Sequence, residues 1–419
     1  MGKQAAELAR TVIVRCRMLA RFSEDSGSTR RTFLSAPMRD CHSEISLWMK
    51  ALGMAVATDA AGNLRGFYPG AGPDAPRLML GSHLDTVPNA GAFDGILGVV
   101  LAVALLESLE KRKLPFGIEI VGFSEEEGVR FGVPFIGSRA LVGRLDADLL
   151  GRQDQRGVSV RKAIEDFGLN AAEVPKALLR DDVLGYVEFH IEQGPVLESL
   201  SRPLGVVEAI VGQNRLEFKF SGRANHAGTT PMEVRCDALA AAAEWIVAVE
   251  RIARNTAGLV ATVGSVQARP GAVNVIAGEV SATLDIRHAS DEVRAEALES
   301  LTRQAGAIAA KRGISVKWNA LLNQRAVAMD RFLTDQVEEA VRNAGCQPHR
   351  MASGAGHDAM ILAEKVPAAM IFLRTPGGLS HDPAESVQPE DVAKAIDCGV
   401  HLLTQLAASR EFLGRTCRA

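Results

Sequence analysis

The chain has 419 residues, enough for two or three domains and a large core. Its 47 Lys and Arg residues nearly balance 50 Asp and Glu residues, and this net charge of −3 gives no electrostatic reason to expect a nucleic acid or a membrane as partner. The longest nearly apolar run, Ile96–Leu106, has eleven residues, against the ~20 that a membrane-spanning helix needs. The N-terminal segment also lacks the apolar run of a secretory signal, so we expect a cytoplasmic protein.

The cysteines are scattered and form no CxxC motif. In a chain of this length they predict reduced, mostly buried thiols rather than disulfides. A catalytic thiol stays open on counting alone. The six residues are Cys16, Cys41, Cys236, Cys346, Cys398 and Cys417.

Helix and strand patterns alternate along the first half of the chain, which predicts an α/β fold with a mixed, mostly parallel sheet. In the strand YVEFHIEQ, Glu188 and His190 share one face. In chain order we expect helices over 3–22 and 37–53, strands over 54–58 and 64–68, a buried strand at 78–80, a helix over 95–111, and strands at 117–123 and 186–193.

The pattern changes near residue 214. Apolar and polar residues alternate cleanly over 216–220 and 280–287, which is typical of an antiparallel sheet with one covered face. We therefore predict a smaller α+β domain, residues 214–329, inserted into a larger domain formed by residues 1–213 and 330–419. The remaining expected elements are helices near 232–253, 290–312, 330–344 and 390–407 and a strand at 368–374.

Histidines and carboxylates follow four predicted strands of the larger domain, in GSHLDTVPNAGAFDG, FSEEEG, HIEQG and LSHDPAE. Ligands of open α/β sheets bind beyond the carboxyl ends of the strands, so we expect these segments to converge. Imidazoles with carboxylates and no thiolate are a ligand set for zinc, manganese, cobalt or nickel. A single histidine of this kind is commonly structural, and an acidic triplet is commonly a solvated loop. Their joint placement favours a metal site.

The motifs GSHLDTV, EEEGVRFG, FHIEQGP, ANHAGTTPM, GAGHDA and LSHDPAE occur in this order. Together they resemble the hydantoinase/carbamoylase branch of the zinc aminoacylase and carboxypeptidase superfamily, over about residues 20–407. The branch includes N-carbamoyl-L-amino-acid hydrolases, β-ureidopropionases and allantoate amidohydrolases. The resemblance implies that the larger domain holds two metal ions and that residues 214–329 form a dimerisation and lid domain.

The resemblance also implies the residues of the site. Glu126 would be the general base, which takes a proton from water and delivers it to the leaving nitrogen, and Asp85 would orient the site from behind. The implied ions are zinc, or manganese, cobalt or nickel, with His83 and His190 on one ion, Glu127 and His381 on the other, and Asp94 between them.

The smaller domain would supply His226 to stabilise the oxyanion, and Asn274 and Arg287 to bind the substrate carboxylate. Arg287 lies on the polar face of its strand, so we expect its guanidinium to be free for a bidentate contact. Residues 230–233 (TPME) predict a capping box at the start of the helix near 232. Further implied substrate contacts are Gln193, Arg215 and Gly356.

These assignments predict a dimeric, metal-dependent amidohydrolase that cleaves the ureido C–N bond of an N-carbamoyl-L-amino acid or allantoate and releases ammonia and CO2. The segment FLRTPGGLSHDPAE favours allantoate slightly. The nearest alternative is an aminoacylase or dipeptidase of the same superfamily, although dipeptidase relatives usually place a carboxylate where His190 stands. A thiol-dependent amidase and a non-catalytic binding protein are two further classes. The first would need a cysteine within a catalytic motif, and the second would be expected to have lost ligands.

Overall fold

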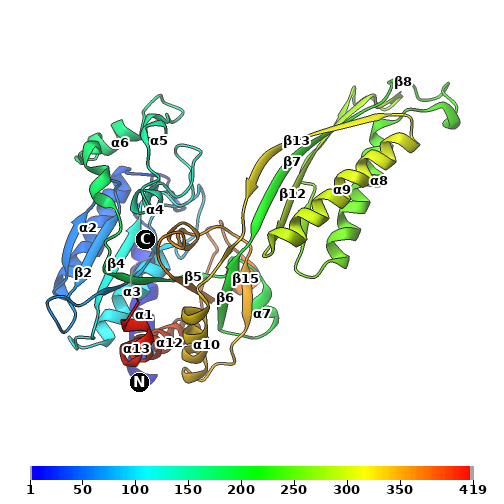
Figure 1. Cartoon of the computed structure of the whole chain (residues 1–419). Coiled ribbons are helices and arrows are strands. Elements are labelled where there is room, and N and C mark those ends of the chain that lie inside the picture. Colours follow the sequence, from blue (N-terminus) through cyan, green and yellow to red (C-terminus); the bar gives the residue numbers. More distant parts are fainter. Residues whose placement is uncertain (1, 416–419) are drawn as a thin grey trace. The chain divides into compact units, whose positions relative to one another are not determined.

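The computed structural model describes residues 2–415, and Cys417 lies outside this range. The chain divides into two compact units. The first comprises the chain up to Glu208 and from Met329 onward, and the second is Ala209–Ala328. Figure 1 labels the elements of both units. Within the described range, none of the helices is long and apolar enough to cross a membrane.

The first unit is built around a mixed sheet, as predicted. Its four central strands, in the order β4-β3-β5-β16, are parallel, whereas the pairs β1-β2, β2-β4 and β16-β6 at its two sides are antiparallel. The parallel part is therefore confined to the centre, where the strands are buried along their whole length. The strands are β1 (Ala55–Thr58), β2 (Leu64–Tyr68), β3 (Arg77–His83), β4 (Gly117–Phe123), β5 (Val183–Ile191), β6 (Leu204–Ile210), β15 (Arg350–Ser353) and β16 (Ala368–Leu373). The short strand β14 (Val327–Ala328) pairs with the last two residues of β6, and all four of these residues fall within the second unit.

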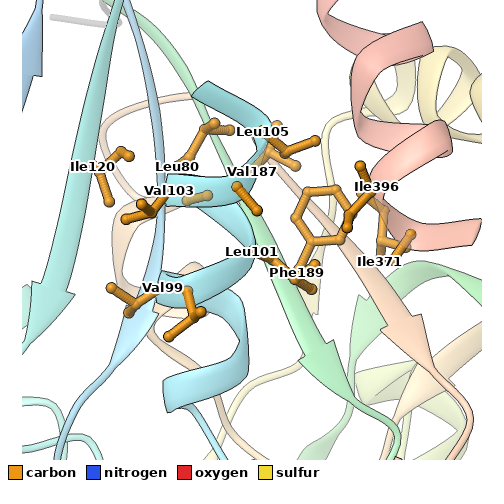
Figure 2. Close-up of a cluster of buried hydrophobic side chains, with 14 of the residues drawn as sticks. Leu80, Val99, Leu101, Val103, Leu105, Ile120, Val187, Phe189, Ile371 and Ile396 are labelled. Carbon is orange, nitrogen blue, oxygen red and sulfur yellow. The ribbon is translucent and has the colours of Figure 1, made fainter. Parts of the chain in front are cut away.

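The helix α3 (Ile96–Ser108) lies at the centre of the largest core. Its first eleven residues are all buried, because the helix contacts β3 and β5 on one side and other helices on the other. Figure 2 shows Val103 beside Leu80 of β3, and Phe189 of β5 near Ile396 of α12. The other helices of this core are α1 (Gly2–Leu19), α2 (Ala36–Ala51), α10 (Arg331–Asn343) and α12 (Pro389–Ala408).

Several short helices of the first unit had no counterpart in the prediction. They have at most seven residues each, too few for a helical period to be recognised. A separate apolar cluster beneath residues 131–177 holds four of them in place. These elements are α4 (Ile136–Leu141), α5 (Ala147–Gly151), α6 (Val160–Asp166), η1 (Ala171–Ala177), α7 (Val196–Ser199), α11 (Asp358–Leu362), η3 (Pro376–Gly378) and α13 (Arg410–Leu413).

The second unit packs two helices against an antiparallel sheet in the order β10-β12-β7-β13, with β9 paired to β12. The alternation seen in the sequence matches this arrangement, since Phe218 and Phe220 of β7 pack on Trp245 of α8. The elements are β7 (Gly212–Ser221), β8 (Asn225–His226), η2 (Met232–Val234), α8 (Ala238–Asn255), β9 (Val260–Thr262), β10 (Val266–Arg269), β11 (Val275–Ile276), β12 (Glu279–His288), α9 (Asp291–Lys311) and β13 (Ser315–Gln324).

The predicted capping box is wrong. Residues 232–234 form only one 3-10 turn, and the backbone at Arg235 is extended. The helix α8 starts at Ala238 instead, where the Asp237 carboxylate accepts hydrogen bonds from the N–H groups of Leu239 and Ala240. A better N-cap five residues downstream of the predicted start therefore decides where the helix begins.

Candidate functional site

Two histidines reach the same point from the adjacent parallel strands β3 and β5. His83 is the last residue of β3, and His190 is the next-to-last of β5. Their Nδ1 atoms each lie 2.9 Å from a backbone carbonyl oxygen, of Asp85 and Ile191 respectively. A carbonyl only accepts, so Nδ1 carries the proton and Nε2 presents a lone pair. Burial lowers the pKa of His190 to about 4, which keeps this imidazole neutral at pH 7.

Asp94 lies between these lone pairs at the start of α3. Its Oδ1 is 3.3 Å from His190 Nε2 and 3.8 Å from His83 Nε2, and it accepts no hydrogen bond from the described residues. Gly95 permits this approach, because a Cβ there would lie 2.4 Å from the His83 ring. Burial alone would raise the pKa of Asp94, but the hydrogen bond with His381 and the nearby imidazoles lower it overall.

These donors fit a metal cation. Two Nε2 lone pairs 3.4 Å apart repel each other, and the buried Oδ1 of Asp94 lacks a compensating partner. A divalent cation would satisfy all three atoms at once, and imidazole with carboxylate is a ligand set for zinc and similar ions.

The three carboxylates of the acidic segment after β4, Glu125 to Glu127, point in two different directions. Glu125 turns away from the histidines and accepts hydrogen bonds from the N–H groups of Phe33 and Arg130. Glu126 and Glu127 face His83, with ligand atoms of all three within 4.8 Å of one another. Burial, and then repulsion by neighbouring carboxylates, raise the pKa of Glu126 and of Glu127 well above the usual range. A nearby cation would relieve this repulsion.

Asp85 fixes the backbone of this acidic segment. Its two carboxylate oxygens accept hydrogen bonds from the N–H groups of Glu126 at 2.9 Å and Glu127 at 3.0 Å. The side chain is almost completely buried. The predicted orienting residue thus contacts the main chain of the expected base and of the expected ligand.

His381 comes from the loop after β16. Its Nε2 lies 3.2 Å from Asp94 Oδ2 and 3.6 Å from Glu127 Oε1. The groups His83–Asp94–His190 and Asp94–Glu127–His381 each bring three ligand atoms within 4.8 Å, and they share Asp94. The structure therefore brings together all five predicted metal ligands, with Asp94 common to both groups.

Gln193 also belongs to this cluster. Its side-chain amide donates to Asp94 Oδ2 at 2.9 Å, and its backbone N–H donates to Thr375 Oγ1. Gly356 lies next to the ring of Phe135, where a Cβ would come within 2.9 Å of it.

A layer of buried polar side chains, formed by His357, Ser353, Glu188 and Ser82, lies next to the site. These residues were not assigned to the site from the sequence. The ring of His357 meets that of His190 edge to face at 4.4 Å, and its Nε2 lies 2.9 Å from Ser353 Oγ. Glu188 accepts hydrogen bonds from Ser82 Oγ and from the N–H of Ala359. Its place on the His190 face of the strand is the signal that could have pointed to it.

In the second unit, Arg287 departs from the prediction. Its guanidinium is not free, because Nε and Nη2 donate to the two oxygens of Asp285 at 2.7 and 2.9 Å. Arg215, from the adjacent strand, donates to the same carboxylate at 3.0 Å. The reason is local geometry: residues 285 and 287 share one face of β12, and Arg215 lies opposite Asp285 in the sheet.

His226 and Asn274 lie on neighbouring segments of the same unit. His226 pairs with Val275 across β8 and β11, and the N–H of Ala227 donates to Asn274 O at 2.9 Å. The side chains of His226 and Asn274 are both exposed. His226 thus lies in the short strand β8.

The cysteines of the described range do not form a nucleophilic site. Cys16, Cys41 and Cys398 are fully buried, and burial raises the pKa of each thiol. Cys236 and Cys346 are also free thiols. Within residues 2–415, four of these five cysteines are buried, as predicted.

Comparison with known proteins places this chain in a family. Residues 79–405 match the profile of Peptidase family M20/M25/M40. The N-carbamoyl-L-amino acid amidohydrolase of Geobacillus stearothermophilus is 38% identical over 387 residues, which cover 92% of this chain and 95% of that protein. The chain belongs to this family.

Two further similarities place the chain within the M20 family. Allantoate deiminase 2 of Glycine max is 37% identical, with 91% of this chain and 86% of that protein covered. A hydantoinase/carbamoylase family amidase from Burkholderia ambifaria has a crystal structure that matches with a TM-score of 0.89 and 33% identity, over 97% of this chain and 98% of that one. The predicted membership of the hydantoinase/carbamoylase branch of a metal-dependent hydrolase family is confirmed.

Proposed function

We propose that this M20 member is a two-metal amidohydrolase that cleaves the ureido C–N bond of an N-carbamoyl-L-amino acid or of allantoate. The observation that carries the proposal is the position of Asp94, shared by the group with His83 and His190 and by the group with Glu127 and His381. The relatives at 37–38% identity carry the names of enzymes for these two substrates.

In this proposal His83 and His190 would hold one divalent ion, Glu127 and His381 would hold the other, and Asp94 would serve both. Ligand type permits zinc, manganese, cobalt or nickel. When bound, the ions would act as Lewis acids for the ureido carbonyl and lower the pKa of a water molecule.

Glu126 is the general base in this mechanism. Water adds to the ureido carbon while Glu126 takes its proton, and the C–N bond then breaks as Glu126 returns the proton to the leaving nitrogen. The carbamate that remains loses CO2, so one equivalent each of ammonia and CO2 is released. Asp85 keeps Glu126 in place through the backbone contact at 2.9 Å.

The remaining roles belong to substrate recognition. We assign the substrate carboxylate to Arg287 and Asn274, and the developing oxyanion to His226, with Gln193 as a polar contact of the ureido group. Arg215 and Gly356 complete the proposed set. Because the Arg287 guanidinium is hydrogen-bonded to Asp285, its orientation toward the substrate would be fixed in advance.

We also propose that the second unit acts as a lid and forms the contact of a homodimer. Its edge strand β13 exposes the large apolar side chains of Trp318 and Leu321, at 47% and 59%. Apolar residues gathered on an unpaired strand edge are typical of an interaction surface. The test is the oligomeric state by sedimentation, in which a monomer would contradict this assignment.

Allantoate is our preferred substrate, from the segment FLRTPGGLSHDPAE. The second candidate activity is that of an aminoacylase or dipeptidase. It is disfavoured by His190, since an imidazole occupies the position where dipeptidase relatives usually carry a carboxylate.

The test is ammonia release by the purified, metal-loaded protein, with and without a chelator. The panel is allantoate, several N-carbamoyl-L-amino acids, N-carbamoyl-β-alanine and an N-acetyl amino acid, the last scored by amino-acid release. Chelator-sensitive turnover of a ureido compound is expected. Turnover of the N-acetyl substrate alone would replace the proposal by the aminoacylase activity, and turnover of none would contradict both.

A further inference from the structure

His381 differs from the other proposed ligands in how it is held. Its side chain is 49% exposed, whereas those of His83, His190 and Asp94 are 2% exposed or less. It lies in a loop between η3 and α12, outside any helix or strand, with a backbone φ of +58°. Neither burial nor secondary structure therefore fixes this imidazole, and another contact must hold its loop.

Glu385, four residues further along the same loop, makes that contact. Its Oε1 accepts hydrogen bonds from the N–H groups of Phe93 at 2.9 Å and of Asp94 at 3.0 Å. Its Oε2 accepts one from Ser380 Oγ at 3.1 Å. The side chain is buried, so these bonds are shielded from water.

The backbone on both sides is shaped for this contact. The N–H of Glu385 donates to the carbonyl oxygen of Asp382, a turn that directs the glutamate back toward Asp94. Gly91 lies directly against it, where a Cβ would be 2.4 Å from Glu385 Cβ and 2.8 Å from its Oε1. Only a glycine lets the two loops approach so closely.

We propose that Glu385 is a positioning residue that ties the His381 loop to the backbone of Asp94 and thereby sets the ligands of the second metal ion. The inference rests on the two-metal site of the proposed function. Asp85 makes the same kind of contact with the acidic segment, where its buried carboxylate also accepts two backbone N–H groups. The first group depends on Glu385 only through Asp94, because its other ligands, His83 and His190, are held by strands; it should therefore be less sensitive to Glu385 than the second group.

The test is equilibrium titration of the metal-free, full-length protein with Co²⁺, followed by calorimetry and by visible absorption of the bound ion. The wild type is expected to bind two ions. Glu385→Ala should bind the second ion about 10–100-fold more weakly, the usual cost of losing a residue that orients a metal ligand, and should weaken the first ion clearly less. Glu385→Gln keeps an oxygen for the two N–H groups and should stay close to the wild type.

Three further variants make the result decisive. His381→Ala should bind a single ion and so marks the signal of the second site. Gly91→Ala pushes the loops apart from the opposite side and should also weaken the second ion, which keeps the test valid if Glu385→Ala fails to fold. Asp154→Ala is the matched control, because the Asp154 carboxylate is 4% exposed and accepts the N–H groups of Arg156 and Val158 in a loop without proposed ligands. It should lower Tm and leave both Co²⁺ affinities unchanged.

The outcomes separate this inference from the proposed function. The positioning role would be overturned if Glu385→Ala bound both ions with wild-type affinity, or if it weakened both ions equally. Either result would leave the two-metal site intact. Weakening of the second ion by Asp154→Ala to the same extent would also overturn it, since any buried carboxylate would then suffice. Binding of fewer than two ions by the wild type would instead overturn the two-metal site itself, and this inference with it.

Discussion

Replacing Asp85 with asparagine removes one of the two acceptors that hold the backbone of Glu126 and Glu127. The carboxylate receives these N–H groups at 2.9 and 3.0 Å. Asparagine keeps one oxygen and turns an NH2 group toward the other N–H, so one bond becomes a repulsive donor–donor contact. A hydrogen bond to a charged group contributes about 1.5–3 kcal/mol. If the whole loss falls on the placement of the base, kcat should drop about 10- to 150-fold.

The stability of the Asp85→Asn protein should change much less than its activity. Burial raises the pKa of Asp85 because the site disfavours its charge. A neutral amide relieves that desolvation cost, which offsets part of the lost hydrogen bond. We therefore expect a small change in Tm together with a large change in kcat, and little change in KM at saturating metal.

The assay is steady-state turnover of the best ureido substrate with metal content measured in parallel. Asp154→Asn provides the matched control, since it makes the same carboxylate-to-amide change where two other backbone N–H groups are accepted. A kcat for Asp85→Asn within about threefold of the wild type, with full metal content, would refute the reasoning that Asp85 positions the base.

Three other expectations concern the same site. Glu126→Gln should reduce turnover at least ~100-fold while metal content stays at the wild-type level, because the base is lost and the ligands remain; loss of metal with activity retained would reverse the assignments of base and ligand. Arg287→Ala should lower kcat/KM about 10- to 150-fold, the value of one charge-assisted contact with the substrate carboxylate, and an unchanged kcat/KM would exclude Arg287 from the site. Burial and neighbouring carboxylates raise the pKa of Glu126 and Glu127. The metal-free folded protein therefore keeps protons on these carboxyl groups that the unfolded chain releases above pH ~4.3. This tighter proton binding stabilises the metal-free fold at low pH, and the stabilisation is lost as the pH rises through the folded-state pKa. Since a metal ion must displace those protons, the gain in Tm on adding Co²⁺ should increase from pH ~5.5 to pH ~8, and a gain independent of pH would contradict this.

Much of the candidate site could be predicted because its histidines and carboxylates occur in short, recognisable sequence motifs. His83 and His190 stand at the ends of strands that an apolar run or a clean alternation reveals, and Glu126 and Glu127 directly follow another. Parallel strands bring their carboxyl ends to one edge, so the convergence followed from topology. Topology thus predicted that the segments meet, whereas the choice of individual ligands came from the resemblance of the motifs to the hydantoinase/carbamoylase branch.

Other features were not predicted correctly from the sequence, because competing local interactions decide them. The start of α8 depended on whether residues 230–233 or Asp237 would cap the helix, and both are reasonable from sequence. Arg287 was expected to be free, but its neighbour on the same strand face, Asp285, engages it. The alternation pattern showed that both face the same way without indicating that they pair.

What the sequence by itself determined is the inventory and its order: imidazoles and carboxylates at the ends of predicted strands, an apolar helix α3 to be buried, and an inserted segment with antiparallel periodicity. What only the tertiary structure decided is which backbone groups the buried carboxylates hold. Asp85 meets the N–H of Glu126 across 41 positions, and Glu385 meets that of Asp94 across 291. The physical reason is that periodicity and propensity act over a few residues, whereas the acceptor for a loop N–H is set by how the packed elements close around it.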